Sequence, residues 1–308
     1  LYIQIQKRNT NTNFVAKILA KYFGVKEKLV SYAGLKDRHA VTEQWFSVHL
    51  PGVKNVELSE LNSDEVKVLN HNWHAKKLKS GAHSANRFEL TLRNVTHLED
   101  FKERWLKVCK SGVPNYFGEQ RFGRNGNNVN SALAMFDGRR LKDRHIRSIY
   151  LSAARSLLFN HQISDRIKNS NFENIIPGDV MMLAGSQSIF LVEETDNELV
   201  ERFESFDIDI TAPMWGTGEL RTKGIVAENE MTVVSDFTEL AAGLSKFGLK
   251  QERRKIRLII SEPNLSCDND ICTVSFNLPA GCFATSILRE LGCFTDVSLS
   301  NVLEKERN

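Results

Sequence analysis

Apolar and polar residues follow the spacing of a strand and then of a helix at the start of the chain. Residues 1–6 alternate apolar and polar side chains, which is typical of a half-buried strand. The apolar residues that follow recur every three or four positions and predict an amphipathic helix ending near Phe23, with Asn11 or Thr12 as its N-cap. We expect the apolar stripe of this helix to face the core. The stripe consists of Phe14, Val15, Ile18, Leu19 and Tyr22.

Strand and helix patterns continue along the chain in an order that suggests an insertion. Strand patterns occur at residues 30–33, 45–50, 66–69, 87–92, 256–260 and 273–278. Helical patterns occur at residues 99–110, 147–167, 237–249 and 283–291. Ser235 or Asp236 is the expected cap of the helix at 237–249. Because strands lie at both ends and helices dominate the middle, we expect an inserted domain, with one mixed sheet built from the outer segments.

The composition is that of a folded protein, and it gives only weak evidence about partners. Hydrophobic residues make up 41% of the 308 residues and charged residues 26%. The formal net charge of +3 is too small to predict nucleic-acid binding by itself. No apolar run reaches the length of a membrane span, and no signal peptide is visible. Because Leu1 stands inside a predicted strand, we expect that an N-terminal segment is missing.

The cysteines predict neither a metal site nor a redox site. Their number is odd, and no two have the C-x-x-C spacing. We expect reduced, inert, buried thiols in a cytoplasmic protein. The five are Cys109, Cys267, Cys272, Cys282 and Cys293.

The polar segment at residues 34–44 is the best candidate for chemistry, because it lies between two predicted strands, where functional loops tend to lie. It places Asp37 between Lys36 and Arg38. Cations that face a carboxylate favour its ionised form, and an ionised carboxylate in a cleft can act as a nucleophile or a general base. Spacing alone favours a simpler interpretation, an Asp that makes backbone hydrogen bonds in a turn. His39 is expected to be structural.

This segment, GLKDRHAVTEQ, resembles the signature G-x-K-D-x-x-A-x-T-x-Q of the TruD family of pseudouridine synthases, in which the Asp is catalytic. All six defined positions match. Similar segments follow in the family's order, and together they cover nearly the whole chain. They are NRF at residues 86–88, GVPNYFGEQRFG at 112–123, LSAARS at 151–156 and LPAGCFATS at 278–286. The family's N-terminal E-D-F-x-V-x-E motif is not found in these residues.

The resemblance implies an α+β fold with two domains. A pseudouridine synthase catalytic domain, on a mixed or antiparallel sheet, would comprise residues 1–111 and 251–308. A helix-rich α/β domain characteristic of the family, the TRUD domain, would be inserted as residues 112–250. The resemblance also implies a cytoplasmic monomer that acts on tRNA, extrudes its target uridine into a pocket between the two domains, and needs no cofactor and no metal.

The resemblance further implies an isomerase that converts a uridine in tRNA, usually uridine-13 near the D-arm, to pseudouridine. Asp37 would start the reaction, either by attack on C1′ or by removal of a C2′ proton. Asn86 would bind the edge of uracil, and Phe283 and Phe88 would stack on the base. Phe88 could equally be a core residue. Lys36 would keep Asp37 ionised or contact phosphate, unless it points to solvent.

Basic clusters would supply the RNA surface, although each alone is more typical of a solvated face. Two alternatives remain open: a non-catalytic RNA-binding protein of the same fold, and a hydrolase of a glycosidic bond, which usually needs two carboxylates. The first cluster is His74, Lys76, Lys77 and Lys79; the second is Arg139, Arg140, Lys142, Arg144, His145 and Arg147; the third is Arg253, Arg254, Lys255 and Arg257.

Overall fold

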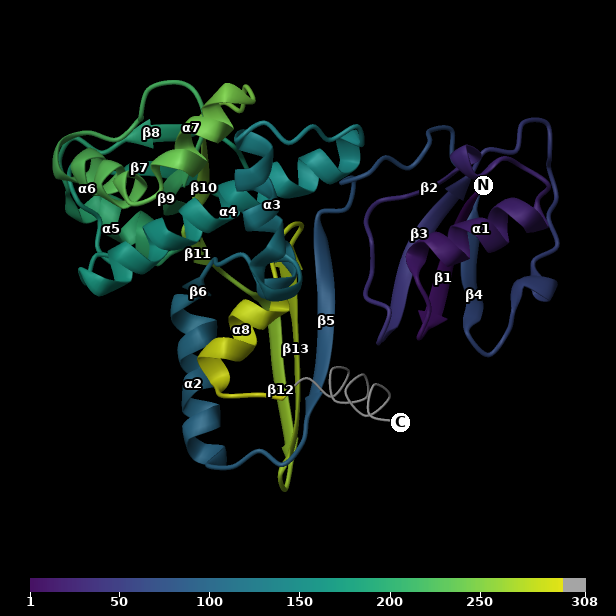
Figure 1. Ribbon diagram of the computed structural model, residues 1–308. Helices are drawn as coiled ribbons and strands as arrows, with labels where there is room; N and C mark the ends of the chain where they lie inside the picture. Colours follow the sequence, from purple (N-terminus) through teal and green to yellow (C-terminus); the bar gives the residue numbers. More distant parts are fainter. Residues whose placement is uncertain (296–308) are drawn as a thin grey trace, which may run out of the picture. The chain divides into compact units, whose positions relative to one another are not determined.

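A computed structural model describes residues 1–295 (Figure 1). The chain forms two compact units, one containing Leu1–Asn86 and the other Arg87–Phe294, and each is described by itself. Helices and antiparallel sheets occur in both parts of the chain, and the predicted α+β class is confirmed. The division into residues 1–111 with 251–308 and residues 112–250 stays a prediction, and its last residues, 296–308, lie outside those described.

The first unit is a four-stranded antiparallel sheet in the order β2-β3-β1-β4. Its strands are β1 (Tyr2–Arg8), β2 (Val30–Tyr32), β3 (Val41–Val48) and β4 (Val66–Asn72). Ile3 and Ile5 are fully buried in β1, which confirms the alternation read from the sequence. Strand β3 begins four residues before the predicted start at residue 45, because the backbone from Val41 to Gln44 pairs with β1 although its side chains are mostly polar.

Helix α1 (Thr12–Tyr22) packs on one face of this sheet (Figure 1). The predicted helix is confirmed, and Val15 and Leu19 are fully buried in the same hydrophobic cluster as Ile3 and Ile5. The prediction for Phe14 is wrong, because 48% of this residue is exposed. Phe14 stands directly before Val15 on the first turn of the helix, at the edge of the apolar stripe. Two short 3-10 helices, Glu27–Leu29 and Ser59–Leu61, complete the unit.

The second unit contains a three-stranded sheet in the order β12-β13-β5, with two helices packed on it. The strands are β5 (Ala85–Leu92), β12 (Ser261–Asp268) and β13 (Ile271–Pro279), and the helices are α2 (Leu98–Ser111) and α8 (Ala284–Leu291). Trp105 from α2 and Ile287 from α8 share a core with Phe276 of β13. The helices and strands predicted at 99–110, 273–278 and 283–291 are therefore confirmed.

A disulfide between Cys267 and Cys272 corrects the prediction that all thiols are reduced. The two residues face each other across the β12–β13 hairpin, with their Cα atoms 4.2 Å apart. Two cysteines five residues apart face each other only once the hairpin register is known, so their spacing in the sequence does not predict this pairing. Of the other cysteines, Cys109 and Cys282 are partly buried and Cys293 is exposed.

The rest of the second unit is a four-stranded sheet in the order β10-β9-β7-β8, surrounded by helices (Figure 1). Its strands are β7 (Val180–Leu183), β8 (Ile189–Leu191), β9 (Ile208–Met214) and β10 (Glu252–Lys255). Its helices are α3 (Asn127–Phe136), α4 (Arg144–Lys168), α5 (Asn197–Glu204), α6 (Gly224–Ser235) and α7 (Thr238–Lys246). A two-stranded pair, β6 (Val113–Pro114) with β11 (Arg257–Leu258), and two 3-10 helices, Glu119–Phe122 and Arg124–Gly126, complete the list.

Two features predicted for this region differ in detail from the structure. The strand predicted at 256–260 is shorter than expected, because only the two-residue strand β11 falls within that range; β10 ends just before it and pairs with a different partner. Helix α7 is capped by neither Ser235 nor Asp236; its N-cap is Phe237, without a side-chain hydrogen bond. The long helix predicted at 147–167 is confirmed as α4. It starts earlier because the carboxylate of Asp143 accepts hydrogen bonds from the backbone N–H groups of His145 and Ile146.

Candidate active site

Asp37 lies in the loop between β2 and β3 of the first unit. The residue is exposed, and Lys36 before it is partly buried. The carboxylate is therefore open to solvent and could be reached by a large substrate such as a nucleic acid. If Asp37 were only a turn residue, its carboxylate would make hydrogen bonds to the nearby backbone. The hydrogen bonds that hold this loop come instead from other side chains.

A buried lysine on strand β1 holds the backbone of this loop. Lys7, on β1, is only 1% exposed. Its ammonium donates to the carbonyl oxygens of Thr10 and Asp37, each at 2.7 Å, and lies 3.5 Å from the carbonyl oxygen of Lys36. Burial lowers the pKa of Lys7, and the negative charge of Asp37 partly opposes that shift. Lys7 thus fixes the path of the chain at Asp37 and places a positive charge beside it.

Thr12 and Gln44 hold the same loop from the side. The backbone N–H of Lys36 donates to the hydroxyl of Thr12, which donates to the side-chain oxygen of Gln44, both at 3.0 Å. The Gln44 amide in turn donates to the carbonyl oxygen of Gly34 at 3.1 Å. This chain of bonds joins helix α1, the loop and strand β3. It gives the first and last residues of the signature, Gly34 and Gln44, a structural reason to occur together.

The glycine at position 34 also has little space around it. A Cβ added at Gly34 would lie 3.2 Å from Cε1 of His83, which is tighter than most real contacts. A larger residue would push the loop or the imidazole aside. The glycine of the signature therefore allows the close approach that this loop needs.

Two of the predicted substrate-binding residues meet in the first unit, although 50 positions separate them in the chain. The Lys36 ammonium donates to the side-chain oxygen of Asn86. Burial lowers the pKa of Lys36, and the charge of Asp37 raises it. Lys36 therefore does not point freely to solvent. With its oxygen held by Lys36, Asn86 keeps its amide nitrogen for donation to a ligand.

The two predicted stacking residues belong to the second unit. Phe88, on β5, is partly buried and packs against the core, with its ring centroid 5.8 Å from that of Phe276. Phe283 is the N-cap residue of α8 and is also partly buried. Its ring lies 6.2 Å from Phe117 and 5.8 Å from the guanidinium carbon of Arg121. The roles of both residues toward a base stay predictions.

The three basic clusters differ in exposure. The first two, at residues 74–79 and 139–147, consist of exposed side chains. The third does not form a solvated basic face, and that part of the prediction is wrong. Arg253 pairs with Glu230 at 2.9 Å and Arg257 with Asp209 at 3.3 Å, and all four side chains are at least 93% buried. Sequence alone could not show these pairs, because their acidic partners lie on other elements.

Asp209 has the most displaced carboxyl pKa among the described residues, but its position excludes contact with a nucleotide. Burial raises its pKa to about 6, and the attraction of Arg257 only partly opposes this. Such a value is typical of a general acid or base. The side chain is 1% exposed, however, so Asp209 belongs to a buried ion pair of the core.

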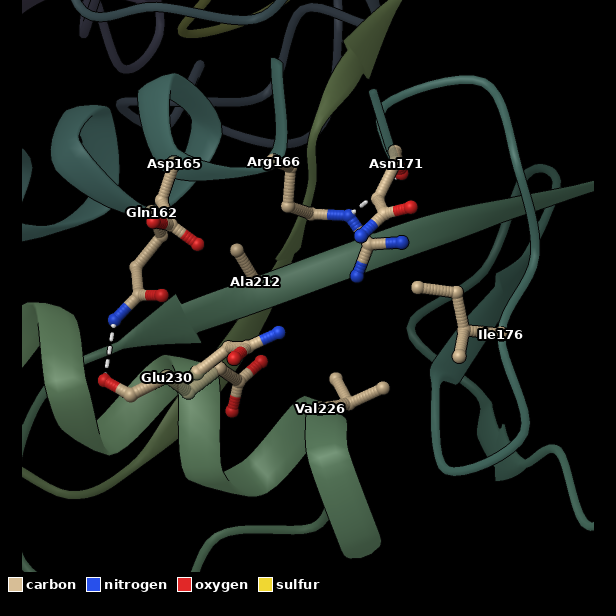
Figure 2. A pocket seen from close by; sticks show the side chains of 9 residues that line it. Gln162, Asp165, Arg166, Asn171, Ile176, Ala212, Val226 and Glu230 are labelled. Carbon is tan, nitrogen blue, oxygen red and sulfur yellow. Dashed lines mark hydrogen bonds between the residues drawn. The ribbon is translucent and has the colours of Figure 1, made fainter. Parts of the chain in front are cut away.

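A small cavity in the second unit is lined by residues of α4, β9 and α6 (Figure 2). Its volume of about 20 Å³ has room for one water molecule and no more. Two of its charged groups are already paired, Arg166 with Asp179 at 2.7 Å and Glu230 with Arg253, and the carboxylate of Asp165 accepts a hydrogen bond from Asn169 at 3.1 Å. We therefore assign it no ligand. Within residues 1–295, no three His, Cys, Asp or Glu side chains gather as metal ligands would, and no helix is long and apolar enough to cross a membrane.

Comparisons with known proteins agree on one family. The model of the TruD family, tRNA pseudouridine synthase D, matches residues 1–140 and 129–291. A tRNA pseudouridine synthase D from Colwellia psychrerythraea is 51% identical over 97% of this chain and 84% of its own length. One from Aeromonas salmonicida is 45% identical over 94% and 83%.

A solved structure from Methanosarcina mazei, described as a tRNA pseudouridine synthase D, shares the fold. Its TM-score is 0.69 at 21% identity, over 94% of this chain and 87% of that one. A likeness at this identity concerns the fold alone. The family match and the two close relatives, together with the signature loop around Asp37, show that this chain belongs to the TruD family of tRNA pseudouridine synthases.

Proposed function

We propose that this chain converts uridine-13, near the D-arm of tRNA, to pseudouridine, with Asp37 as the catalytic carboxylate. Membership of the family supports isomerisation of a uridine in tRNA. The observation that carries the role of Asp37 is its combination of an exposed side chain with an anchored backbone. Lys7, Thr12 and Gln44 fix the loop, while the carboxylate remains accessible.

The reaction breaks the bond between N1 of uracil and C1′ of the ribose and forms a bond between C5 and C1′. The C5 proton is lost and N1 gains a proton, so the mass of the RNA does not change. Asp37 would either attack C1′ or remove the C2′ proton, and a carboxylate is suited to both. Lys7 and Lys36 place positive charge near the loop that carries this carboxylate.

Binding of the target base would involve Asn86, Phe283 and Phe88. The amide nitrogen of Asn86 would donate to a carbonyl oxygen of uracil. A phenylalanine ring can stack on a base that has left the RNA helix, and such stacking contributes about 1–3 kcal/mol. Phe283 stands at the start of helix α8 and packs against Phe117, and the ring of Phe88 packs against Phe276. The exposed clusters at 74–79 and 139–147 would contact phosphates.

We further propose that the protein works as a cytoplasmic monomer and that the reaction needs neither a cofactor nor a metal. The first step is assigned to the carboxylate of Asp37, and binding of the base to Asn86, Phe283 and Phe88. Gel filtration with light scattering tests the monomeric state, and turnover in the presence of EDTA tests whether the reaction needs a metal.

The variant Asp37→Asn tests the assignment. We expect pseudouridine formation in an unmodified tRNA transcript, mapped by chemical adduct sequencing, to fall at least about 100-fold. The affinity for tRNA should stay within about threefold of wild type. Asp64→Asn, at another exposed position of the same unit, is the matched control.

Three other outcomes would contradict the proposal in different ways. Unchanged turnover of Asp37→Asn would remove Asp37 from the reaction. Release of free uracil would indicate a hydrolase of the glycosidic bond. Binding of tRNA by the wild-type chain with no pseudouridine formed at any position would favour a non-catalytic RNA-binding protein of the same fold.

A further inference from the structure

An open hollow lies beside the loop that carries Asp37, and the reaction described above leaves it without a role. Its volume is about 350 Å³, within the range of about 300–1,000 Å³ that small-ligand pockets occupy. Phe14 and Lys17 of α1 line one side, and Leu35 and Lys36 of the loop line the other. All four belong to the first unit. We call this site the Phe14 hollow.

The residues that line the Phe14 hollow fall into two sets. Those that build its wall are occupied: Thr12 is bonded to Gln44 and Lys36, and the Asn13 oxygen accepts the hydroxyl of Tyr32. Asn11, Phe14, Lys17 and Leu35, which also line the hollow, are all exposed. The wall is thus held in place, while an aromatic ring, an aliphatic side chain, an amide and an ammonium are presented to a ligand.

Phe14 and Leu35 are two of the large apolar residues that are exposed in this unit, and both line the Phe14 hollow. Phe14 is 48% exposed and Leu35 72%, whereas their neighbours in the fold, Val15 and Leu19, are fully buried. Single exposed apolar residues are common, but two that line the same hollow form a patch able to bind an apolar surface. The flat face of Phe14 is suited to a planar, aromatic ligand.

The charge around the Phe14 hollow points to an anionic ligand. Residues 1–40 contain eight lysines and arginines but only two acidic residues, although the whole chain has a net charge of only +3. Helix α1 carries Lys17 and Lys21 and no acidic residue. An aromatic face beside an uncompensated ammonium is the combination that single-stranded nucleic acid requires, because bases stack on the ring and phosphates pair with the cation.

We propose that the Phe14 hollow binds the nucleotide adjacent to the target uridine, with its base stacked on Phe14 and its phosphate paired with Lys17. This inference rests on the proposed role of Asp37. Lys36 lines the hollow and Asp37 follows it directly, and consecutive Cα atoms lie about 3.8 Å apart. A nucleotide held in the hollow would therefore neighbour the one whose sugar meets Asp37. It would help to keep the RNA strand open while the uridine reacts.

Binding measurements with an unmodified tRNA transcript test the two contacts separately. In the Asp37→Asn background, chosen to slow turnover, we expect Phe14→Ala to weaken tRNA binding about tenfold. Phe14→Leu, which keeps the apolar volume but not the ring, should give a similar loss. Lys17→Ala should reduce the dependence of log Kd on log salt by nearly one unit, as expected for one lost phosphate contact. Lys54→Ala, an exposed lysine elsewhere in the unit, should change neither quantity by as much.

A photo-crosslinking residue at position 14 identifies the nucleotide. We expect the crosslink to map to the residue immediately before or after the pseudouridine formed by the wild-type chain. A crosslink to a distant nucleotide, or to a second protein chain, would overturn the proposal. So would wild-type affinity and salt dependence in both Phe14→Leu and Lys17→Ala. These outcomes are independent of Asp37→Asn turnover, which alone decides the proposed function.

Discussion

The ammonium of Lys7 donates a hydrogen bond of 2.7 Å to the carbonyl oxygen of Asp37, so a fully buried cation is attached to the backbone of an exposed acid. Burying an ammonium is costly, because its hydration is lost. The cost is offset here by two strong bonds to carbonyl oxygens, those of Thr10 and Asp37. The arrangement stiffens the loop from inside the unit and leaves its outer surface free for a substrate.

Replacing Lys7 with methionine should therefore impair turnover more than binding. Lys7→Met removes both bonds and the nearby positive charge, while keeping a side chain of similar length. We expect kcat to fall about 10–100-fold in single-turnover assays, with tRNA affinity within about twofold of wild type. Lys67→Met, at an exposed position of β4, is the control and should leave kcat unchanged. A parallel loss of affinity and kcat would indicate that Lys7 supports the fold as a whole.

The hydroxyl of Thr12 offers a second test of loop anchoring. Thr12→Val keeps the shape but leaves the backbone N–H of Lys36 and the side-chain oxygen of Gln44 without their partner. We expect the free energy of unfolding of the first unit to fall by about 1–3 kcal/mol in urea titrations, and kcat to fall with it. Thr12→Ser, which retains the hydroxyl, should recover most of both. Equal behaviour of the valine and serine variants would show that these bonds contribute little.

These anchoring contacts mark the limit of what the sequence could predict about the site. The signature identified Asp37 and placed it in a loop between strands, because polar residues flanked by apolar alternation indicate a loop. It could not identify Lys7, because this lysine follows the strand predicted at residues 1–6 and a charged side chain there gives no sign of burial. The pairing of Lys36 with Asn86 was also invisible, because a contact across 50 positions requires the tertiary fold.

The fold itself was predictable where one face of an element is buried. Residues 1–6 and 273–278 show this, since alternation requires one buried face. Prediction failed where burial depends on a distant partner. Phe14 was expected in the core because its spacing fits the helix stripe, yet the sheet covers Val15 and Leu19 and leaves Phe14 exposed. Arg253 and Arg257 were expected on the surface because charged residues usually lie there, but each meets a buried acid on another element.

The disulfide between Cys267 and Cys272 should contribute to stability and not to turnover. It closes a loop with a sequence separation of five residues, for which the chain-entropy estimate is about 2 kcal/mol. We expect wild-type protein to lose about that much unfolding free energy when dithiothreitol is added. The Cys267→Ser/Cys272→Ala variant should not respond to dithiothreitol and should form pseudouridine at the wild-type rate. Detection of both thiols as free in air-oxidised, folded protein would contradict the pairing.

Asp209 should make the stability of the second unit depend on pH in the mildly acidic range. Its pKa is raised by burial from 3.8 to about 6, so the folded state holds a proton that the unfolded state releases. The stabilisation from this group is present in full below about pH 4 and is lost as pH rises through about 6. One pKa unit corresponds to about 1.4 kcal/mol, which gives a total change of up to about 3 kcal/mol.

Urea titrations at a series of pH values between 4 and 7 would measure this effect, with Asp209→Asn as the matched variant. The ion pair with Arg257 only partly offsets the cost of burial: Oδ2 of Asp209 accepts a hydrogen bond of 3.4 Å from Nε of Arg257, whereas Oδ1, 3.3 Å from the same nitrogen, accepts no hydrogen bond within the described residues. We expect the free energy of unfolding of the wild-type chain to fall relative to that of Asp209→Asn as pH rises. This holds even if the two proteins differ in stability by a constant amount. Parallel curves over this range would mean that Arg257 keeps Asp209 ionised throughout, and the raised pKa would be wrong.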